Sequence, residues 1–242
     1  MYAIKTEDLT KKYGDKTAVD GLNLTVNQGE LYALLGVNGA GKSTTIKMLS
    51  CLTQPTSGDA LIHDFSIRKN TGDVKKLINV SPQETAVAAK LSVRENLEFI
   101  ARIYGSGKKE ARQKAQEMIE KFSMTEIAKD KASTLSGGWQ RRLSIAMALI
   151  SEPKVLFLDE PTLGLDVLAR RELWHVIAML KGKITIILTT HYLEEAENLS
   201  DRIGIMSKAK LRAEGTAAEL KSMAGTDDFE EAFIKIAGEG LK

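Results

Sequence analysis

A glycine-rich segment that contains adjacent lysine and serine residues, Gly36–Thr44, constrains the fold of this chain more than any other feature. It follows a continuous apolar run, Leu31–Leu35, which is typical of a strand buried on both faces of a parallel sheet. It opens an apolar-periodic stretch, Thr45–Cys51, which is typical of a helix. This order of strand, loop and helix predicts a phosphate-binding loop, because free amides at a helix start attract anions.

Each residue type in this segment has a physical role. Glycines permit turns and a close backbone approach to phosphate that a Cβ would obstruct. We expect Lys42 to reach the β- and γ-phosphates of a nucleotide and the Ser43 hydroxyl to bind Mg²⁺. By itself the motif indicates only nucleotide phosphate binding, which kinases, GTPases, helicases and transport motors share. The residues expected to contact the nucleotide here are Gly36, Asn38, Gly39, Ala40, Gly41, Lys42, Ser43 and Thr44.

Two carboxylates follow a second apolar run. Val155–Leu158 is continuous and apolar, and Asp159 and Glu160 come directly after it. Open α/β folds bind ligands at the carboxyl ends of their strands, so both acids are expected at that edge. There Asp159 would hold Mg²⁺ through its water shell, and Glu160 would polarise the attacking water as general base. The alternative is an exposed acidic turn after a strand, which is common for a single carboxylate.

A histidine ends a third apolar strand. Ile184–Thr190 is apolar in its first half and leads to His191, so this side chain is expected at the same sheet edge as Glu160. It could hydrogen-bond a γ-phosphate or hold the attacking water. A lone histidine is more often a surface residue or a satisfied core residue, so this interpretation depends on the other motifs.

Short apolar runs alternate with amphipathic segments along the chain, which is the pattern of α/β proteins. Tyr2–Leu9 and Leu22–Val26 alternate in part, as half-exposed antiparallel strands do. Lys108–Phe122 places its apolar residues on one helical face. We therefore predict a phosphate-loop NTPase (RecA-like) α/β core with an N-terminal antiparallel β subdomain and an inserted α-helical subdomain. The expected single domain, 1–242, divides into a core with β subdomain at 1–86 and 151–215, helices at 87–150 and a short helical tail at 216–242.

Composition excludes little. The chain has 242 residues, 43% of them hydrophobic, and a formal net charge of +2, which does not indicate nucleic-acid binding. Its one cysteine allows no intramolecular disulfide, and the amino terminus lacks the pattern of a secretory signal. No run approaches the roughly 18 consecutive apolar residues that a membrane span requires. If the protein serves a membrane process, we expect another polypeptide to cross the bilayer.

A further motif lies upstream of the two carboxylates. Leu135–Arg142 reads LSGGWQRR and resembles the LSGGQ signature of ATP-binding-cassette (ABC) ATPases. The resemblance extends from about Tyr2 to Gly215, in family order and at family-like separations. It implies that Tyr13 stacks on adenine and that Gln83 senses Mg²⁺ and the attacking water. It also implies that Leu163–Asp166 forms the D-loop, with Asp166 near the nucleotide, and that His191 is the switch histidine.

The resemblance also implies how the site is completed. In this family ATP lies between the phosphate loop of one subunit and the signature of its partner. Ser136, Gly137 and Gly138 would therefore donate hydrogen bonds to the partner's γ-phosphate. We expect a homodimer with two competent sites, although a heterodimer stays open. One departure is Trp139, which replaces the usual glutamine and is expected to pack within its own helical subdomain, the alternative being that it packs against the nucleotide.

Within the family, the chain looks most like ATPases of bacterial ABC-2-type exporters, on the wording of Leu135–Leu143 and Phe229–Lys235. This implies an ATP- and Mg²⁺-dependent motor that is cytoplasmic, on the inner face of the cell membrane. It would dock on separately encoded integral membrane permease subunits through residues 83–105 and move a drug, peptide or lipid-like substrate. The alternatives are an importer ATPase, or a soluble ABC ATPase acting on nucleic acid or ribosomes. The latter usually has a second cassette, a long coiled coil or zinc-binding cysteines, so no nucleic-acid partner is expected.

Overall fold

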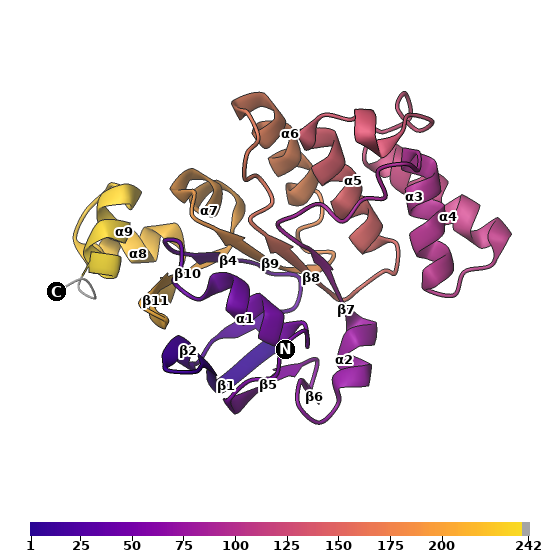
Figure 1. Cartoon of the computed structure of the whole chain (residues 1–242). Helices are drawn as coiled ribbons and strands as arrows, with labels where there is room; N and C mark the ends of the chain where they lie inside the picture. Colours follow the sequence, from indigo (N-terminus) through magenta and orange to yellow (C-terminus); the bar gives the residue numbers. More distant parts are fainter. Residues whose placement is uncertain (239–242) are drawn as a thin grey trace.

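Two β-sheets and the helices around them form the part of the chain that the computed structural model describes, residues 1–238 (Figure 1). The larger sheet has six strands in the order β11-β10-β4-β9-β8-β7. Its strands β10, β4, β9, β8 and β7 run parallel, and β11 pairs antiparallel with β10 at the edge. The bounds are β4 Leu31–Leu35, β7 Ile78–Ser81, β8 Val155–Asp159, β9 Thr185–Thr190, β10 Arg202–Ser207 and β11 Lys210–Gly215.

The three apolar runs of the sequence form the centre of this sheet. Every residue of β4, β8 and β9 is buried, because both faces of the sheet are covered. Leu31, Ala33 and Leu35 face one hydrophobic core, and Tyr32 and Leu34 face a second core on the opposite side. The predicted α/β class with a buried parallel sheet is confirmed.

The second sheet is antiparallel and lies below the first in Figure 1. Its strands are β1 Tyr2–Tyr13, β2 Lys16–Leu22, β3 Thr25–Asn27, β5 Ser57–Ile62 and β6 Phe65–Ser66. The prediction of one strand over Leu22–Val26 was wrong, because β2 ends where that segment begins and β3 starts at Thr25. Asn23 between them bonds the main chain and side chain of Asp8, where β1 bulges with φ 47°.

Helices cover both faces of the large sheet. Helix α1 (Lys42–Leu49) packs with the antiparallel sheet on one face, and α5, α6, α7 and α9 contribute to the core on the other. The remaining helices lie at the ends or edges of the molecule in Figure 1. The bounds of the helices after α1 are α2 Thr71–Leu77, α3 Val93–Ile103, α4 Lys108–Lys121, α5 Gly137–Leu149, α6 Val167–Ala178, α7 Leu193–Leu199, α8 Ala217–Ala224 and α9 Phe229–Gly238, with a 3-10 turn at Ala132–Thr134.

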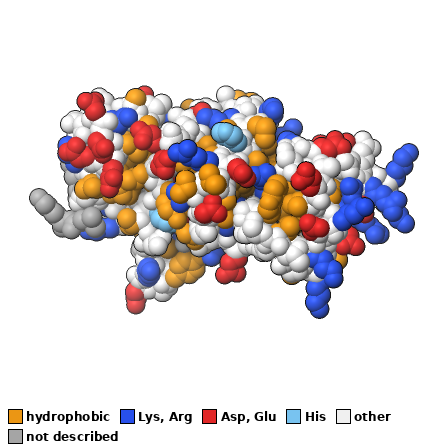
Figure 2. Space-filling model, turned by 90° about the horizontal axis from the view of Figure 1, so that it is seen from above, with side chains coloured by type: hydrophobic (Ala, Val, Ile, Leu, Met, Phe, Trp, Pro, Cys, Tyr) orange, Lys and Arg blue, Asp and Glu red, His pale blue; other side chains and the backbone are white. Residues whose placement is uncertain are grey.

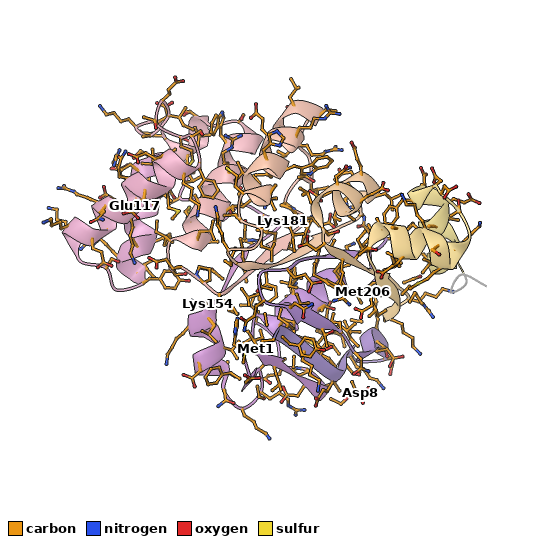
Figure 3. All side chains as sticks on the ribbon, turned by 180° about the vertical axis from the view of Figure 1, so that it is seen from behind. Met1, Asp8, Glu117, Lys154, Lys181 and Met206 are labelled. Atoms are coloured by element: carbon orange, nitrogen blue, oxygen red, sulfur yellow. The ribbon has the colours of Figure 1, made fainter. Side chains whose placement is uncertain are left out.

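The segment between β7 and β8 is helical and projects away from the sheets. Helix α3 begins with a capping box between Ser92 and Glu95, and α4 buries Ala111, Ala115 and Ile119 against its neighbours. The outer face of α4 is polar: Glu117 points outward in Figure 3, and Lys and Arg side chains gather at this end of the molecule in Figure 2. The division of the chain into the ranges 1–86, 87–150, 151–215 and 216–242 stays a prediction, and residues 239–242 lie outside the described part. Within residues 1–238 no helix has both the length and the hydrophobicity that crossing a membrane requires.

Candidate active site

A cavity of about 370 Å³ opens at the carboxyl edge of the six-stranded sheet. Most of the predicted site residues meet here, although they come from five separate stretches of the sequence. The cavity is lined by Tyr13, Lys16, Ala18, Asn38, Gly39, Ala40, Gly41, Lys42, Ser43, Thr44, Gln83, Glu160, Leu163 and His191.

Strand register brings the catalytic candidates to this edge. Asp159, the last residue of β8, is paired with Thr189 of β9, and Thr190 is paired with Leu35 of β4. Three neighbouring parallel strands therefore end side by side, one leading to the glycine-rich loop, one to Glu160 and one to His191. This is the arrangement expected for ligand sites of open α/β sheets.

Two glycines of the loop are required by close backbone contacts. A Cβ on Gly36 would lie 2.4 Å from the Met206 carbonyl oxygen, and one on Gly41 would lie 2.4 Å from the Ala18 carbonyl oxygen. Gly41 also has φ 110°, a conformation that side chains rarely adopt, directly before α1 begins. The amino terminus of α1 therefore faces the cavity with its amides unobstructed, which suits an anionic ligand.

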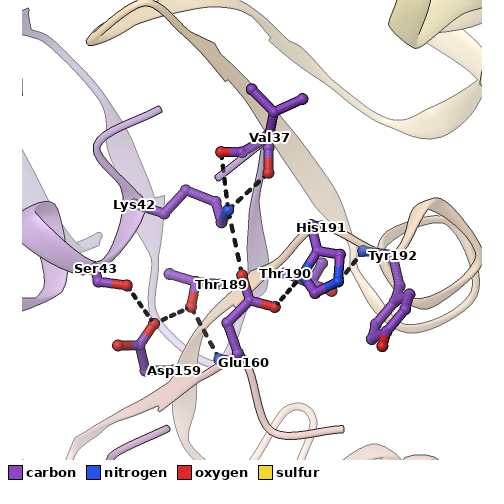
Figure 4. A network of polar contacts seen from close by, with 10 residues as sticks. Val37, Lys42, Ser43, Asp159, Glu160, Thr189, Thr190, His191 and Tyr192 are labelled. Atoms are coloured by element: carbon purple, nitrogen blue, oxygen red, sulfur yellow. Dashed lines mark hydrogen bonds and ion pairs between the residues drawn. The ribbon is translucent and has the colours of Figure 1, made fainter. Parts of the chain in front are cut away.

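Lys42 is the cation of the loop, and it is almost fully buried, with 5% of its surface exposed. Its Nζ donates to the Gly36 carbonyl at 2.6 Å and to the Val37 carbonyl at 3.3 Å, and it lies 3.2 Å from Glu160 Oε1 (Figure 4). The ammonium is thus held within the loop and next to the candidate base.

Glu160 connects this lysine to the histidine. Its other oxygen, Oε2, lies 2.7 Å from His191 Nδ1, so the ring N–H donates to the carboxylate (Figure 4). Glu160 is 6% exposed and has φ 48°, a left-handed conformation that costs a non-glycine residue on the order of 1 kcal/mol. Its backbone N–H donates to Thr189 Oγ1 at 3.1 Å, which holds the residue in that conformation at the cavity wall.

Asp159 lies on the other side of the strand end and contacts the loop serine. Ser43 Oγ donates to Asp159 Oδ1 at 3.0 Å, and the Thr189 hydroxyl donates to the same oxygen. With Gln83 at the cavity wall, these residues supply hard oxygen donors of the kind that Mg²⁺ prefers. No cluster of three or more His, Cys, Asp or Glu residues within 1–238 could hold a metal alone.

Tyr13 lines the cavity and is 49% exposed, with Lys11 Nζ 5.0 Å from the centre of its ring. A half-exposed ring in the lining of a phosphate site is suited to stacking on a base. Lys16 and Ala18 also line the cavity and were not predicted, and so does Leu163, the first residue of the predicted D-loop. Lys16 and Ala18 follow Tyr13 closely in the sequence, which is the one signal that could have indicated them.

The signature residues do not line this cavity. Ser136 is the N-cap of α5 and accepts from Trp139 N at 3.5 Å, and Gly137 and Gly138 form the first turn of that helix. Asp166 also stands apart from the cavity, as the N-cap of α6, where it accepts from Ala169 N at 2.9 Å. Within one chain, therefore, the phosphate loop and the signature are separate.

Trp139 packs on the hydrophobic core beneath the helices, with the Arg142 guanidinium 4.3 Å from the centre of its ring. This position matches the expectation that it packs within its own part of the chain. The indole is thereby occupied by intramolecular contacts.

Two buried charged residues near the site were not predicted. Arg141 of α5 is 4% exposed, and its guanidinium donates to the main-chain carbonyls of Pro82 and Gln83. Glu195 of α7 is fully buried and accepts from Trp174 Nε1 at 3.1 Å. Burial raises the pKa of the Glu195 carboxyl above its usual range.

The fold and this site define a phosphate-loop nucleotide-binding cassette with a separate signature helix. Comparison with known proteins agrees with that class. The family model described as ABC transporter matches residues 19–163. The daunorubicin resistance ATP-binding protein DrrA3 of Streptomyces coeruleorubidus is 41% identical over 98% of this chain and 75% of its own length. The linearmycin resistance ATP-binding protein LnrL of Bacillus subtilis is 42% identical over 93% of this chain and 72% of its own length.

Other relatives differ in length, and solved structures agree in fold. The probable multidrug ABC transporter ATP-binding protein YbhF of Escherichia coli is 40% identical, and this chain spans 41% of its length. The solved ATP-binding subunit of an ABC transporter superposes with a TM-score of 0.84 at 27% identity, over 97% of this chain and 99% of that one. A dimeric post-hydrolysis cassette, MJ0796, bound to ADP and Pi, superposes with a TM-score of 0.78 at 26% identity. The match covers 88% of this chain and 98% of that one.

The chain belongs to the ABC transporter family and has the fold of its ATP-binding cassettes. The sequence resemblance to this family is thereby confirmed. The roles of the individual site residues stay predictions.

Proposed function

We propose that this chain hydrolyses ATP as the motor subunit of an ABC exporter that moves drug-like, peptide or lipid-like compounds through separate permease subunits. The single observation that carries the ATPase part is the contact of Glu160 with both Lys42 and His191 at the cavity wall. Relatives whose names refer to daunorubicin and linearmycin resistance support the exporter part.

The two contacts of Glu160 define its role as general base. When phosphates enter the cavity, the Lys42 ammonium turns from the Glu160 carboxylate toward their oxygens, which frees Oε1 to accept a proton from water. His191 donates to Oε2 and keeps the carboxylate oriented, and its ring also lines the cavity where the γ-phosphate would lie. The main-chain amides at the start of α1 balance the phosphate charge.

Mg²⁺ would be held by Ser43 and Gln83 directly and by Asp159 through water. The bound ion would neutralise charge between the β- and γ-phosphates. The Asp159 carboxylate already accepts from Ser43 and Thr189, so its position is fixed before any ligand binds. Ser43 makes one of these hydrogen bonds and also lines the cavity.

A second copy of the chain would complete each site. Ser136 and Gly137 are exposed at the open amino terminus of α5, so their donors are available to a nucleotide on another cassette. Nearby Val167 and Leu168, at the start of α6, are 61% and 74% exposed. Exposed apolar side chains beside an unused helix terminus are consistent with an interface that forms around ATP. We propose a homodimer, as in the dimeric cassette to which this chain is similar.

The permease would dock on the helical part of the chain. A hollow of about 480 Å³ on α3 is lined by apolar and charged side chains, among them Phe99 at 51% exposure and Ile103 at 62%. Glu95, Glu98 and Arg102 surround them. This mixture suits an amphipathic helix of a partner, and it would place the chain on the cytoplasmic face of the membrane.

Affinity capture tests the proposal. Tagged Glu160→Gln chain with ATP and Mg²⁺ would be recovered from detergent-solubilised native membranes and its partners identified by mass spectrometry. We expect a polytopic membrane protein that is lost when Phe99→Glu is added. Recovery of ribosomal or DNA-repair proteins alone, with the chain absent from membranes, would overturn the transport role and leave the ATPase assignment intact.

A further inference from the structure

Arg141 makes a contact that neither the family motifs nor the proposed mechanism uses. Its two terminal nitrogens donate to two consecutive main-chain carbonyls, those of Pro82 and Gln83. The planar guanidinium suits this geometry because its N–H groups form a rigid fork. The fork therefore fixes the main chain at the residue whose side chain faces the nucleotide cavity.

The burial of Arg141 shows that the contact is specific. The residue is 4% exposed, and within residues 1–238 no carboxylate lies within ion-pair distance of its guanidinium. Burial of a cation is costly, and desolvation lowers the pKa of Arg141, an effect that the charges of Asp159 and Glu195 offset only in part. Its guanidinium donates to the two carbonyls, so its position depends on the segment at 82–83.

Gln83 lies where two hollows meet. It lines the nucleotide cavity, and it also lines a second hollow of about 390 Å³ together with Gly137, Arg141 and Leu165. The second hollow is thus bounded by the Gln83 segment, the signature helix and the loop before α6. Gln83 is thus in the wall of both the nucleotide cavity and the hollow beside the signature helix.

A second contact makes α5 and the end of β7 one unit. Ser144 lies three residues after Arg141 on the same face of α5, and its hydroxyl is 3.0 Å from that of Ser81, the last residue of β7. Ser136, which caps α5, lies five residues before Arg141. The signature and the Gln83 segment are therefore attached to the same two turns of one helix.

We propose that Arg141 is a positioning residue that holds Gln83 at the nucleotide and makes its place depend on the helix that carries the signature. The proposal rests on the proposed ATPase function. When a nucleotide on the partner cassette binds at the amino terminus of α5, α5 moves. The hydrogen bonds of Arg141 then move Gln83 in the chain's own site with the helix. Nucleotide bound on one cassette thereby affects hydrolysis on the other.

Arg141→Lys tests this, since a lysine keeps the charge but cannot donate to both carbonyls in a fork. Steady-state hydrolysis by the full chain is measured against ATP and Mg²⁺, and ATP affinity is measured by calorimetry. We expect kcat to fall more than threefold and the Mg²⁺ concentration for half-maximal rate to rise. ATP affinity should stay within twofold, because the phosphate loop is unchanged. Arg141→Gln should behave the same way.

Arg142→Lys is the matched control. Arg142 is the next residue of α5 and is also largely buried, but it bonds Glu172 at 2.8 Å and does not contact the Gln83 segment. We expect its kcat and Mg²⁺ requirement to stay within twofold of the native chain. An Arg142→Lys defect as large as that of Arg141→Lys would mean that α5 is merely sensitive to substitution and would overturn the proposal.

A double-mutant cycle with Gln83→Ala separates positioning from general destabilisation. If Arg141 acts through Gln83, Arg141→Lys has no further effect on kcat once Gln83 is alanine. Effects that multiply, a kcat loss below threefold, or failure of both Arg141 variants to fold would each overturn the proposal. If the native chain does not hydrolyse ATP, the proposed function fails first, which is a separate result.

Discussion

Lys42 and Glu160 form an ion pair of 3.2 Å in the cavity where phosphates would bind, and both side chains are nearly buried, at 5% and 7% exposure. The cation of the phosphate loop and the candidate base therefore neutralise each other. In the proposed mechanism phosphate binding breaks this pair, and the carboxylate becomes available to water when its lysine has another anion to bind.

Lys42→Ala should destabilise the chain as well as weaken nucleotide binding. It leaves the Glu160 charge buried without this partner, which we expect to lower the free energy of unfolding by about 3 kcal/mol. Adding Glu160→Gln to Lys42→Ala should recover part of that loss, because the buried carboxylate is then neutral. Urea unfolding of both variants measures the effect, and a double variant no more stable than Lys42→Ala would contradict it. Unchanged ATP affinity of Lys42→Ala by calorimetry would count against the phosphate-loop assignment.

His191→Ala should slow hydrolysis without preventing ATP binding. The His191 Nδ1–H is 2.7 Å from Glu160 Oε2, so its loss leaves the carboxylate free to rotate away from the attacking water. We expect kcat to fall about tenfold, which corresponds to about 1.4 kcal/mol in the barrier. His175→Ala on α6 is a suitable control, since that histidine does not line the nucleotide cavity. Equal rates for native chain and His191→Ala would remove the histidine from the mechanism.

Glu195 gives the chain a pH-dependent stability. Burial raises the pKa of its carboxyl, so the folded state binds a proton that the unfolded state releases at lower pH. Stability from this group is present below the ordinary glutamate pKa and is lost as pH rises through the raised value. Glu195→Gln keeps an acceptor for Trp174 Nε1 and cannot ionise. The melting temperature of this variant relative to that of the native chain should therefore rise as the pH increases from 5 to 8.

The exposed neighbour Glu194 supplies the control for this prediction. Glu194→Gln should melt in parallel with the native chain across the same pH range. A difference between Glu195→Gln and the native chain that did not change with pH would show that the buried carboxyl stays in one protonation state.

The sequence predicts most of the central sheet, because each central strand is a continuous apolar run that ends in a chemical motif. Leu31–Leu35 forms β4 as expected, and Val155–Leu158 forms β8 with Asp159 added. The antiparallel sheet was harder to predict from the sequence. Its break between β2 and β3 depends on Asn23 bonding Asp8, and such a long-range contact leaves no periodic pattern.

The sequence motifs indicated the residues that meet at the cavity, but they did not indicate the two buried charged residues near it. The burial of Arg141 and Glu195 depends on how α5 and α7 pack on the sheet, and an isolated charged residue is normally expected at the surface. Asp166 caps α6 in the structure, a role that an aspartate before an apolar helix also predicts. Its place near nucleotide, which the family resemblance implies, stays a prediction.

We propose that Glu160 is the general base of an ATPase that closes around nucleotide as a pair of chains. Purified Glu160→Gln tests this through its hydrolysis rate and oligomeric state, measured together by phosphate release and light scattering with ATP and Mg²⁺. We expect native ATP affinity, hydrolysis at least tenfold slower, a barrier increase of about 1.4 kcal/mol or more, and accumulation of the dimer. A variant that turned over at the native rate and stayed monomeric would contradict it.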